Sequence, residues 1–120
     1  MCVKVLLAED AESMRRALSL LFTDREDIAV VGEAKSLPET FRKILELKPD
    51  VVIVDLHMSK GVTVPLPDGP KVLAISFTND AEIQKLADDI GADRLLDTLS
   101  LSNEMIPAVL RLGNSVRPEH

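Results

Sequence analysis

A short run of β-branched residues, Val51-Val52-Ile53-Val54, sets the strongest limit on the fold of this chain. The run ends at Asp55, and its apolar side chains follow one another without alternation. A strand of this kind is apolar on both faces, so other elements must cover both sides of it. Parallel sheets that are covered by helices on both faces provide this environment. The chain must therefore supply neighbouring strands and the helices that connect them.

The rest of the sequence supplies both kinds of element in alternation. Short apolar runs predict strands over 3–8, 28–34, 71–76 and 94–97. Apolar residues at helical spacing predict helices over about 12–23, 36–47, 80–90 and 102–112. In the second helix we expect one buried face formed by Phe41, Ile44, Leu45 and Leu47. The predicted fold class is α/β, a doubly wound five-stranded parallel sheet that forms one domain over 1–120.

The connection between Asp55 and Lys71 interrupts this alternation. Its fifteen residues contain three prolines, which exclude an ordinary helix, namely Pro65, Pro67 and Pro70. We therefore expect the third helix of the domain to be shortened or absent. Its place over the sheet is expected to be taken by Val62, Val64 and Leu66. Apolar sheet surface left open there would favour a homodimer or a bound partner.

Composition excludes several classes of protein. Twenty acidic and fourteen basic residues give a net charge of −6, which argues against nucleic acid as a direct partner. The absence of Tyr and Trp removes the usual platforms for base stacking. The sequence contains no apolar run of membrane-spanning length, and its single cysteine cannot form an internal disulfide. These features predict a cytoplasmic globular domain.

Polar side chains end four of the five predicted strands. The first strand leads to Glu9 and Asp10, the third to Asp55, the fourth to Ser76, and the fifth to Asp97 and Thr98. Each of these alone is typical of a helix cap or a turn. Because ligands of an open parallel sheet bind outside the carboxyl ends of its strands, the set together predicts a binding site at that edge.

Three carboxylates at one edge repel one another strongly. At an effective dielectric constant near 20, one pair 4 Å apart costs about 4 kcal/mol. The cluster must therefore take up protons or hold a cation. Oxygen ligands without a nearby cysteine favour Mg²⁺ over zinc. Mg²⁺ beside the free carboxylate of Asp55 is typical of phosphoryl transfer, with the aspartate as the nucleophile.

The sequence resembles the receiver domain of two-component response regulators over essentially its whole length. The resemblance rests on the acidic pair Glu9-Asp10, the run VVIVDLHM around Asp55, the hydroxyl of Ser76 and the tripeptide Gly91-Ala92-Asp93. The segment 30–34 (VVGEA) looks like the subfamily that is often fused to LuxR-type helix-turn-helix domains.

The resemblance implies a flavodoxin-like fold with strand order 2-1-3-4-5. It implies that a histidine kinase or a phosphotransfer protein donates a phosphoryl group to Asp55, and that the domain then acts on a downstream protein partner rather than as an enzyme. Mg²⁺ would be held by Asp10, Asp55 and the backbone carbonyl of His57, with Glu9 acting through water. The switch positions of the family fall on Ser76, Leu95 and Thr98.

Some of these positions depart from the family pattern. The lysine expected after the fifth strand is replaced by Thr98, and the expected aromatic residue is replaced by Leu95. Phe77 stands where a small residue is common, and Ser59 where proline is usual. We therefore expect an atypical receiver that accepts a phosphoryl group but couples it unusually to its partners. Lys60 is a candidate replacement for the missing charge.

Two other functions remain open from the sequence. The first is a pseudo-receiver, which uses the same fold as a protein-interaction module without phosphorylation. The second is a hydrolase with an aspartyl nucleophile, which would require a second aspartate at the position of His57. The Asp-x-His sequence at 55–57 also occurs in cobalamin-binding proteins, but Gly61 lies one residue too late for that motif.

Overall fold

The computed structural model describes residues 2–59 and 65–115. The strands are β1 (Val3–Ala8), β2 (Ile28–Ala34), β3 (Val51–Asp55), β4 (Lys71–Ser76) and β5 (Arg94–Asp97). The α-helices are α1 (Glu12–Leu21), α2 (Leu37–Leu47), α3 (Ala81–Ile90) and α4 (Leu101–Ser115), and two short 3₁₀ helices are η1 (Leu56–Ser59) and η2 (Thr98–Ser100). No helix in these described ranges is long and apolar enough to span a membrane.

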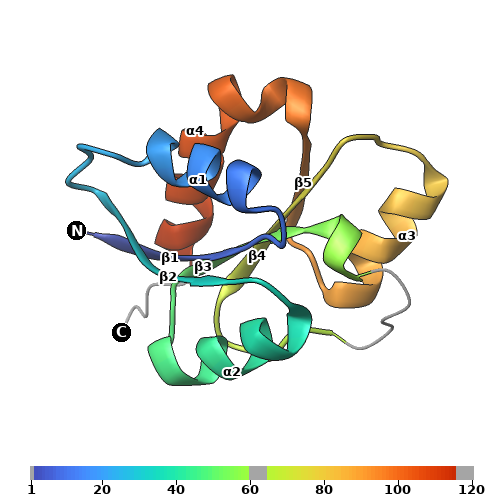
Figure 1. The fold of residues 1–120 in the computed structure, drawn as a ribbon, viewed down its shortest axis with the longest axis horizontal. Helices are drawn as coiled ribbons and strands as arrows, with labels where there is room; N and C mark the ends of the chain where they lie inside the picture. Colours follow the sequence, from blue (N-terminus) through green and yellow to red (C-terminus); the bar gives the residue numbers. More distant parts are fainter. Residues whose placement is uncertain (1, 60–64, 116–120) are drawn as a thin grey trace.

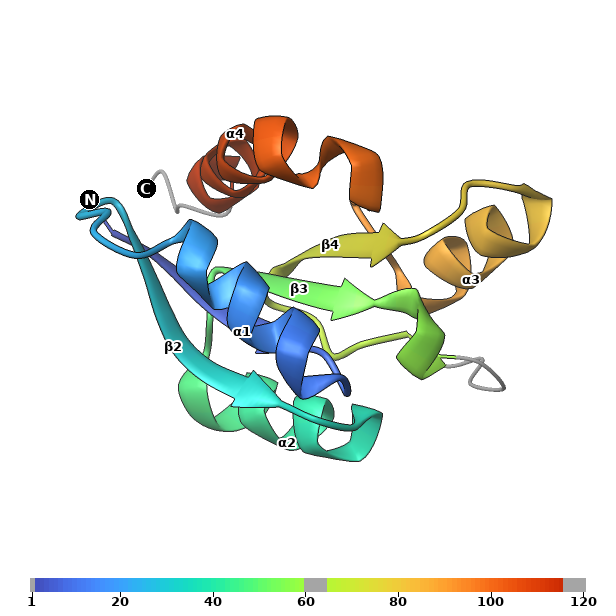
Figure 2. The same cartoon turned by 45° about the horizontal axis from the view of Figure 1, so that its top comes forward.

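The five strands form one parallel sheet in the order β2-β1-β3-β4-β5. This confirms the predicted α/β class and strand order. In Figure 2 the arrowheads of β2, β3 and β4 point the same way, so their carboxyl ends reach a common edge. Crossover helices return the chain between parallel strands, as the alternation of elements requires.

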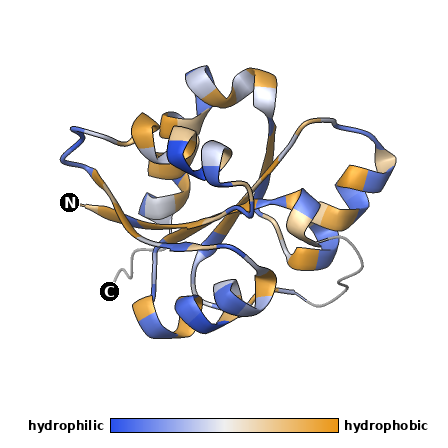
Figure 3. Ribbon diagram, viewed as in Figure 1, coloured by the Kyte–Doolittle hydropathy of each residue, from blue (hydrophilic) through white to orange (hydrophobic). Residues whose placement is uncertain are grey.

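Each face of the sheet carries its own hydrophobic core. On one face, α1 and α4 cover a cluster that contains Leu7, Ile53 and Met105. On the other face, α2 and α3 cover a cluster that contains Leu6, Val54 and Ile90. Figure 1 shows α1 and α4 on one side of the sheet and α2 on the other, and Figure 3 shows that the central strands are largely hydrophobic. Adjacent residues of β1 thus enter different cores, as the unbroken apolar runs predict.

In its described part, the connection from β3 to β4 carries η1 and, over 65–70, residues without helix or strand. The shortened third helix is therefore confirmed for those residues. Leu66 is buried with the α2 and α3 cluster, as expected, whereas Lys60, Val62 and Val64 lie outside the described residues. The predicted apolar opening over the sheet is wrong for the described strand residues, because Val52, Val54, Val72 and Ala74 are all buried on this face.

The predicted helix boundaries are close to those of the structure. The hydroxyl of Ser36 accepts a hydrogen bond from the backbone of Glu39 and caps α2, and Asp80 caps α3 in the same way. Helix α1 ends two residues earlier than expected, and α4 extends to Ser115 and contains Pro107. The prediction for Leu45 was wrong: its side chain is 65% exposed on the outer side of α2.

Candidate functional site

Three carboxylates meet at the carboxyl edge of the sheet. Oxygen atoms of Glu9, Asp10 and Asp55 all lie within 4.8 Å of one another. Glu9 is 1% exposed and Asp55 is 7% exposed, whereas Asp10 faces solvent. The strands β1 and β3 are direct neighbours in the sheet, so residues that follow their last positions are brought together. The structure therefore forms the acidic cluster that the sequence predicts.

Backbone hydrogen bonds hold the two acidic segments in place. The N–H of Glu9 donates to the carbonyl of Ala34 on β2 at 2.9 Å. The N–H of Ala11 donates to Oε2 of Glu9 at 3.2 Å, and the N–H of His57 donates to Oδ1 of Asp55 at 3.0 Å. One oxygen of each buried carboxylate is thus bound to the backbone of its own turn, and the other is left to face the cluster.

The protonation of Glu9 reflects this crowding. Burial is the largest cause that raises the pKa of the Glu9 carboxyl, the neighbouring carboxylate of Asp55 acts in the same direction, and the resulting pKa is about 8. The hydrogen bond from Ala11 lowers the pKa of Glu9 and only partly offsets these effects. Glu9 therefore carries a proton at neutral pH when no cation is bound.

The donor set fits a divalent cation. Within the described residues, Oε1 of Glu9 is a buried oxygen with no hydrogen-bond partner, and such an atom is costly unless a ligand satisfies it. All three side chains offer oxygen, the ligand type that Mg²⁺ prefers. These residues fit the metal that the sequence predicts. The backbone carbonyl of His57 stays a predicted fourth ligand.

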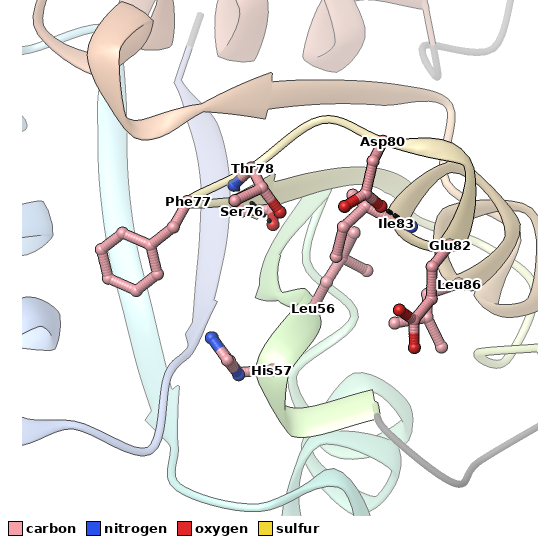
Figure 4. A pocket seen from close by; sticks show the side chains of 9 residues that line it. All are labelled: Leu56, His57, Ser76, Phe77, Thr78, Asp80, Glu82, Ile83 and Leu86. Atoms are coloured by element: carbon pink, nitrogen blue, oxygen red, sulfur yellow. Dashed lines mark hydrogen bonds between the residues drawn. The ribbon is translucent and has the colours of Figure 1, made fainter.

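A pair of rings stands beside Asp55. The His57 and Phe77 rings meet edge to face with centroids 5.8 Å apart. They separate two small cavities: one of about 270 Å³ includes Glu9, Asp10 and Asp55, and the other, of about 190 Å³, includes Ser76. Figure 4 shows both rings on one side of the second cavity, with Leu56, Ile83 and Leu86 on the other. The ring pair therefore forms a shared wall of the acidic cavity.

Comparison with known proteins decides the family. Residues 5–99 match the response regulator receiver domain. The chain belongs to this family.

The relatives of this receiver include whole response regulators. It is 33% identical over 111 residues to the response regulator VraR of Staphylococcus epidermidis, an alignment that covers 86% of this chain and 53% of the relative. It is also 33% identical over 123 residues to VraR of Staphylococcus saprophyticus, covering 96% and 58% of the two chains. The receiver thus spans little more than half the length of these curated relatives.

Solved receiver domains share the fold. The signal receiver domain of NarL from Mycobacterium tuberculosis superposes with a TM-score of 0.79 at 25% identity, covering 94% of this chain and 97% of that one. A LuxR-family two-component response regulator from Aurantimonas sp. gives 0.78 at 22% identity, covering 96% and 87%. The second structure is from the subfamily that the sequence resembles, and at this identity it supports the fold alone.

The predicted switch residues of the receiver lie in β4 and β5 or directly after β5. Ser76 is buried, and its Oγ accepts a hydrogen bond from the N–H of Thr78 at 3.3 Å. Leu95 is half-buried and packs against the hydrophobic cluster under α2 and α3. Thr98 is half-buried at the first position of η2, directly after Asp97, whose carboxylate caps that helix. Ser76 lies beside Asp97 in the sheet. Thr98 has a neutral side chain, so it brings no positive charge to this edge. Their roles as a switch stay a prediction.

One residue of this edge was missed by the sequence analysis. Arg15 on α1 is 7% exposed, and its guanidinium contacts the carbonyl of Glu9. The available signal was its spacing, because Arg15 lies three residues before Leu18 and seven before Phe22 and so shares their buried stripe. A charged residue on a buried stripe is rare unless it is paired, and it points to a specific contact.

Proposed function

We propose that Asp55 of this receiver accepts a phosphoryl group from a phosphohistidine donor, either a histidine kinase or a phosphotransfer protein, in the presence of Mg²⁺. The observation that supports this most directly is the convergence of Glu9, Asp10 and Asp55 within 4.8 Å at the carboxyl edge of the sheet. Membership of the receiver family supports the same chemistry.

The chemistry assigned to Asp55 is a nucleophilic substitution at phosphorus. The free carboxylate oxygen attacks the phosphorus atom, an O–P bond forms, and the P–N bond of the donor breaks. The bonding electron pair leaves with the imidazole nitrogen of the donor. His57 N–H already binds Oδ1 of Asp55, so Oδ2 is the oxygen we assign to the attack. Bound Mg²⁺ would be held by Asp10, Asp55 and the backbone carbonyl of His57, with Glu9 acting through water, and would neutralise charge on the phosphoryl oxygens.

Ser76 supplies a hydroxyl on the next strand. Its oxygen accepts a hydrogen bond from Thr78, so its own proton remains available to donate to a phosphoryl oxygen. We assign the receiver to signalling rather than to enzymatic turnover, since the phosphoryl group stays on the protein and alters its affinity for a downstream protein partner. The relatives continue beyond the region that aligns with this receiver, so an output domain in the same polypeptide is one form that partner takes.

The test is intact-mass spectrometry after incubation with acetyl phosphate, with and without Mg²⁺. We expect a gain of one phosphoryl group that requires Mg²⁺ and is absent in Asp55→Asn. Asp50→Asn is the matched control, because Asp50 lies at the opposite edge of the sheet. Its carboxylate accepts a hydrogen bond from the backbone N–H of Lys4. Labelling that persists in Asp55→Asn would contradict the assignment of the acceptor.

A pseudo-receiver is the second candidate, and Thr98 and Leu95 favour it. A receiver without the lysine charge and without an aromatic ring on β5 lacks two parts of the family's usual response. The same mass experiment separates the two functions when Thr98→Lys is included. No labelling of the parent or of Thr98→Lys would reject phosphorylation and leave a protein-interaction module.

A further inference from the structure

Arg15 has contacts that the proposed phosphoryl chemistry does not use. Its Nη1 donates to the backbone carbonyl of Glu9 at 2.9 Å, and its Nε donates to Oε1 of Glu33 on β2 at 2.7 Å. The guanidinium is buried, while Glu33 is half-exposed. Removing one partner of a buried charged contact destabilises the fold, so both contacts of Arg15 are expected to persist. One side chain of α1 therefore joins the end of β1 to β2.

The contact acts on the turn that carries two of the three carboxylates. The N–H of Glu9 is bound to Ala34, its carbonyl is bound by Arg15, and its carboxylate receives the N–H of Ala11. The N-cap of α1 is Ala11, which has no side-chain oxygen to fix the start of the helix. Arg15 thus provides the side-chain anchor at this turn that a capping residue would normally provide.

The arginine contacts this turn without an ion pair to the carboxylates of the cluster in the part of the chain that the structure describes. In the described part of the chain its ion pair is with Glu33, and its other contact is to a backbone carbonyl. Its positive charge is therefore matched by Glu33, away from the cluster. The carboxyl oxygens of Glu9, Asp10 and Asp55 therefore remain available to a cation.

We propose that Arg15 is a positioning residue for Mg²⁺, which holds the Glu9–Ala11 turn so that Glu9 and Asp10 are presented to the metal together with Asp55. This inference rests on the proposed function, since it requires a metal at the acidic cluster. Arg15 would not touch the metal itself but would hold the backbone of a residue that supplies one of the carboxylates. Outer contacts of this kind typically change metal affinity by about 10- to 100-fold when they are lost.

Isothermal titration with MgCl₂ tests the proposal on the unphosphorylated protein. Arg15→Lys keeps the positive charge and a long aliphatic side chain but replaces the planar guanidinium by a single ammonium group. The ammonium cannot contact both Glu33 and the carbonyl of Glu9 in the same geometry. We expect its dissociation constant for Mg²⁺ to rise by about tenfold. Arg16→Lys is the matched control, because Arg16 is the next residue of α1, is exposed and pairs with Glu12. Its affinity should equal that of the parent.

Two further measurements separate positioning from folding. Glu33→Gln removes the ion pair but leaves the Arg15 contact to the carbonyl of Glu9, so we expect a smaller loss of Mg²⁺ affinity than in Arg15→Lys. Thermal unfolding without metal reports the structural contribution. A lower Tm for Arg15→Lys with a dissociation constant within twofold of the parent, measured well below that Tm, would overturn the proposal. Absence of Mg²⁺ binding by the parent would reject the metal site itself, and this inference with it.

Discussion

Thr98 places a neutral hydroxyl next to the strand end where receivers usually carry a lysine. In the structure it starts η2 and leaves Asp97 to cap that helix. In the proposed function, the carboxylate of Asp55 would therefore react with a phosphoryl donor without a fixed cation from this position. A partly exposed ion pair contributes up to about 1 kcal/mol, which corresponds to roughly fivefold in rate. The charge at this one residue is thus a modest but measurable determinant of reactivity.

We predict that Thr98→Lys increases the rate of labelling by acetyl phosphate by about fivefold, because the added ammonium attracts the anionic donor. The rate is measured by intact mass at several times in saturating Mg²⁺. Thr98→Gln is the control for side-chain length and should label at the parent rate. Equal rates for the lysine and glutamine variants would show that charge at this position does not act on the phosphoryl site.

The Glu9 carboxyl makes stability depend on pH when Mg²⁺ is absent. Its pKa in the folded protein is about 8, above the ordinary value of 4.5. Between these values the unfolded chain has lost the proton and the folded chain retains it, so the free energy of unfolding falls as pH rises. The slope approaches about 1.4 kcal/mol per pH unit for one proton.

We therefore predict that urea denaturation without metal gives a lower free energy of unfolding at pH 8 than at pH 5. Glu9→Gln should flatten this dependence, whereas Glu12→Gln should preserve it because Glu12 is exposed on α1. Saturating Mg²⁺ should stabilise the parent most at the higher pH, where binding no longer has to displace a proton. The same slope in the parent and in Glu9→Gln would contradict the assignment to this carboxyl.

At the scale of elements, the sequence predicts strands better than it predicts helix surfaces. The run Val51–Val54 can only be a strand buried on both sides, so the sheet and its neighbours follow from it. Helical spacing predicts which face of a helix is buried, but not which residues at the border of that face are exposed. Leu45 lies one residue, or about 100°, beyond Ile44, and this rotation turns it outward. The apolar stripe of α1 was likewise defined from apolar residues alone, so it did not include Arg15, which is buried beside Leu18.

The packing of α4 on β1 offers a test at the same scale. A Cβ added at Gly113 would lie 2.5 Å from Cγ1 and 2.7 Å from Cγ2 of Val3, which is buried. Alanine is the better helix former, so propensity alone predicts that Gly113→Ala stabilises α4. We predict the opposite, a loss of about 1–3 kcal/mol, because overpacking outweighs propensity in a tight contact. Urea denaturation measures this change.

The double variant Gly113→Ala with Val3→Ala identifies the cause. If the clash with Val3 is responsible, shortening that side chain makes room for the new methyl group. The alanine at 113 should then cost less in the Val3→Ala background than in the parent. An equal cost in both backgrounds would point to another contact of α4.

At the scale of the whole molecule, the acidic cavity and the cavity beside α3 share the side chains of His57 and Phe77. Ser76 at the end of β4 and Thr78 after it lie next to the cavity that Ile83 and Leu86 line. Leu95 is held in the cluster on this face by apolar packing and has no hydroxyl with which to respond to a new charge. A local change in charge acts at a distance only when it biases an element with two alternative arrangements. The aliphatic packing of Leu95 provides no polar partner for such a change.

We therefore predict that phosphorylation alters amide hydrogen exchange close to Asp55 but changes it little in β5. The measurement is exchange by mass spectrometry of the receiver with acetyl phosphate and Mg²⁺, with Asp55→Asn treated in the same way as control. Peptides covering 56–59 and 76–80 should become more protected, because the phosphoryl group gains hydrogen bonds there. A change at 94–97 as large as the change at 76–80 would show that Leu95 transmits the signal without an aromatic ring, and that the coupling runs through apolar repacking.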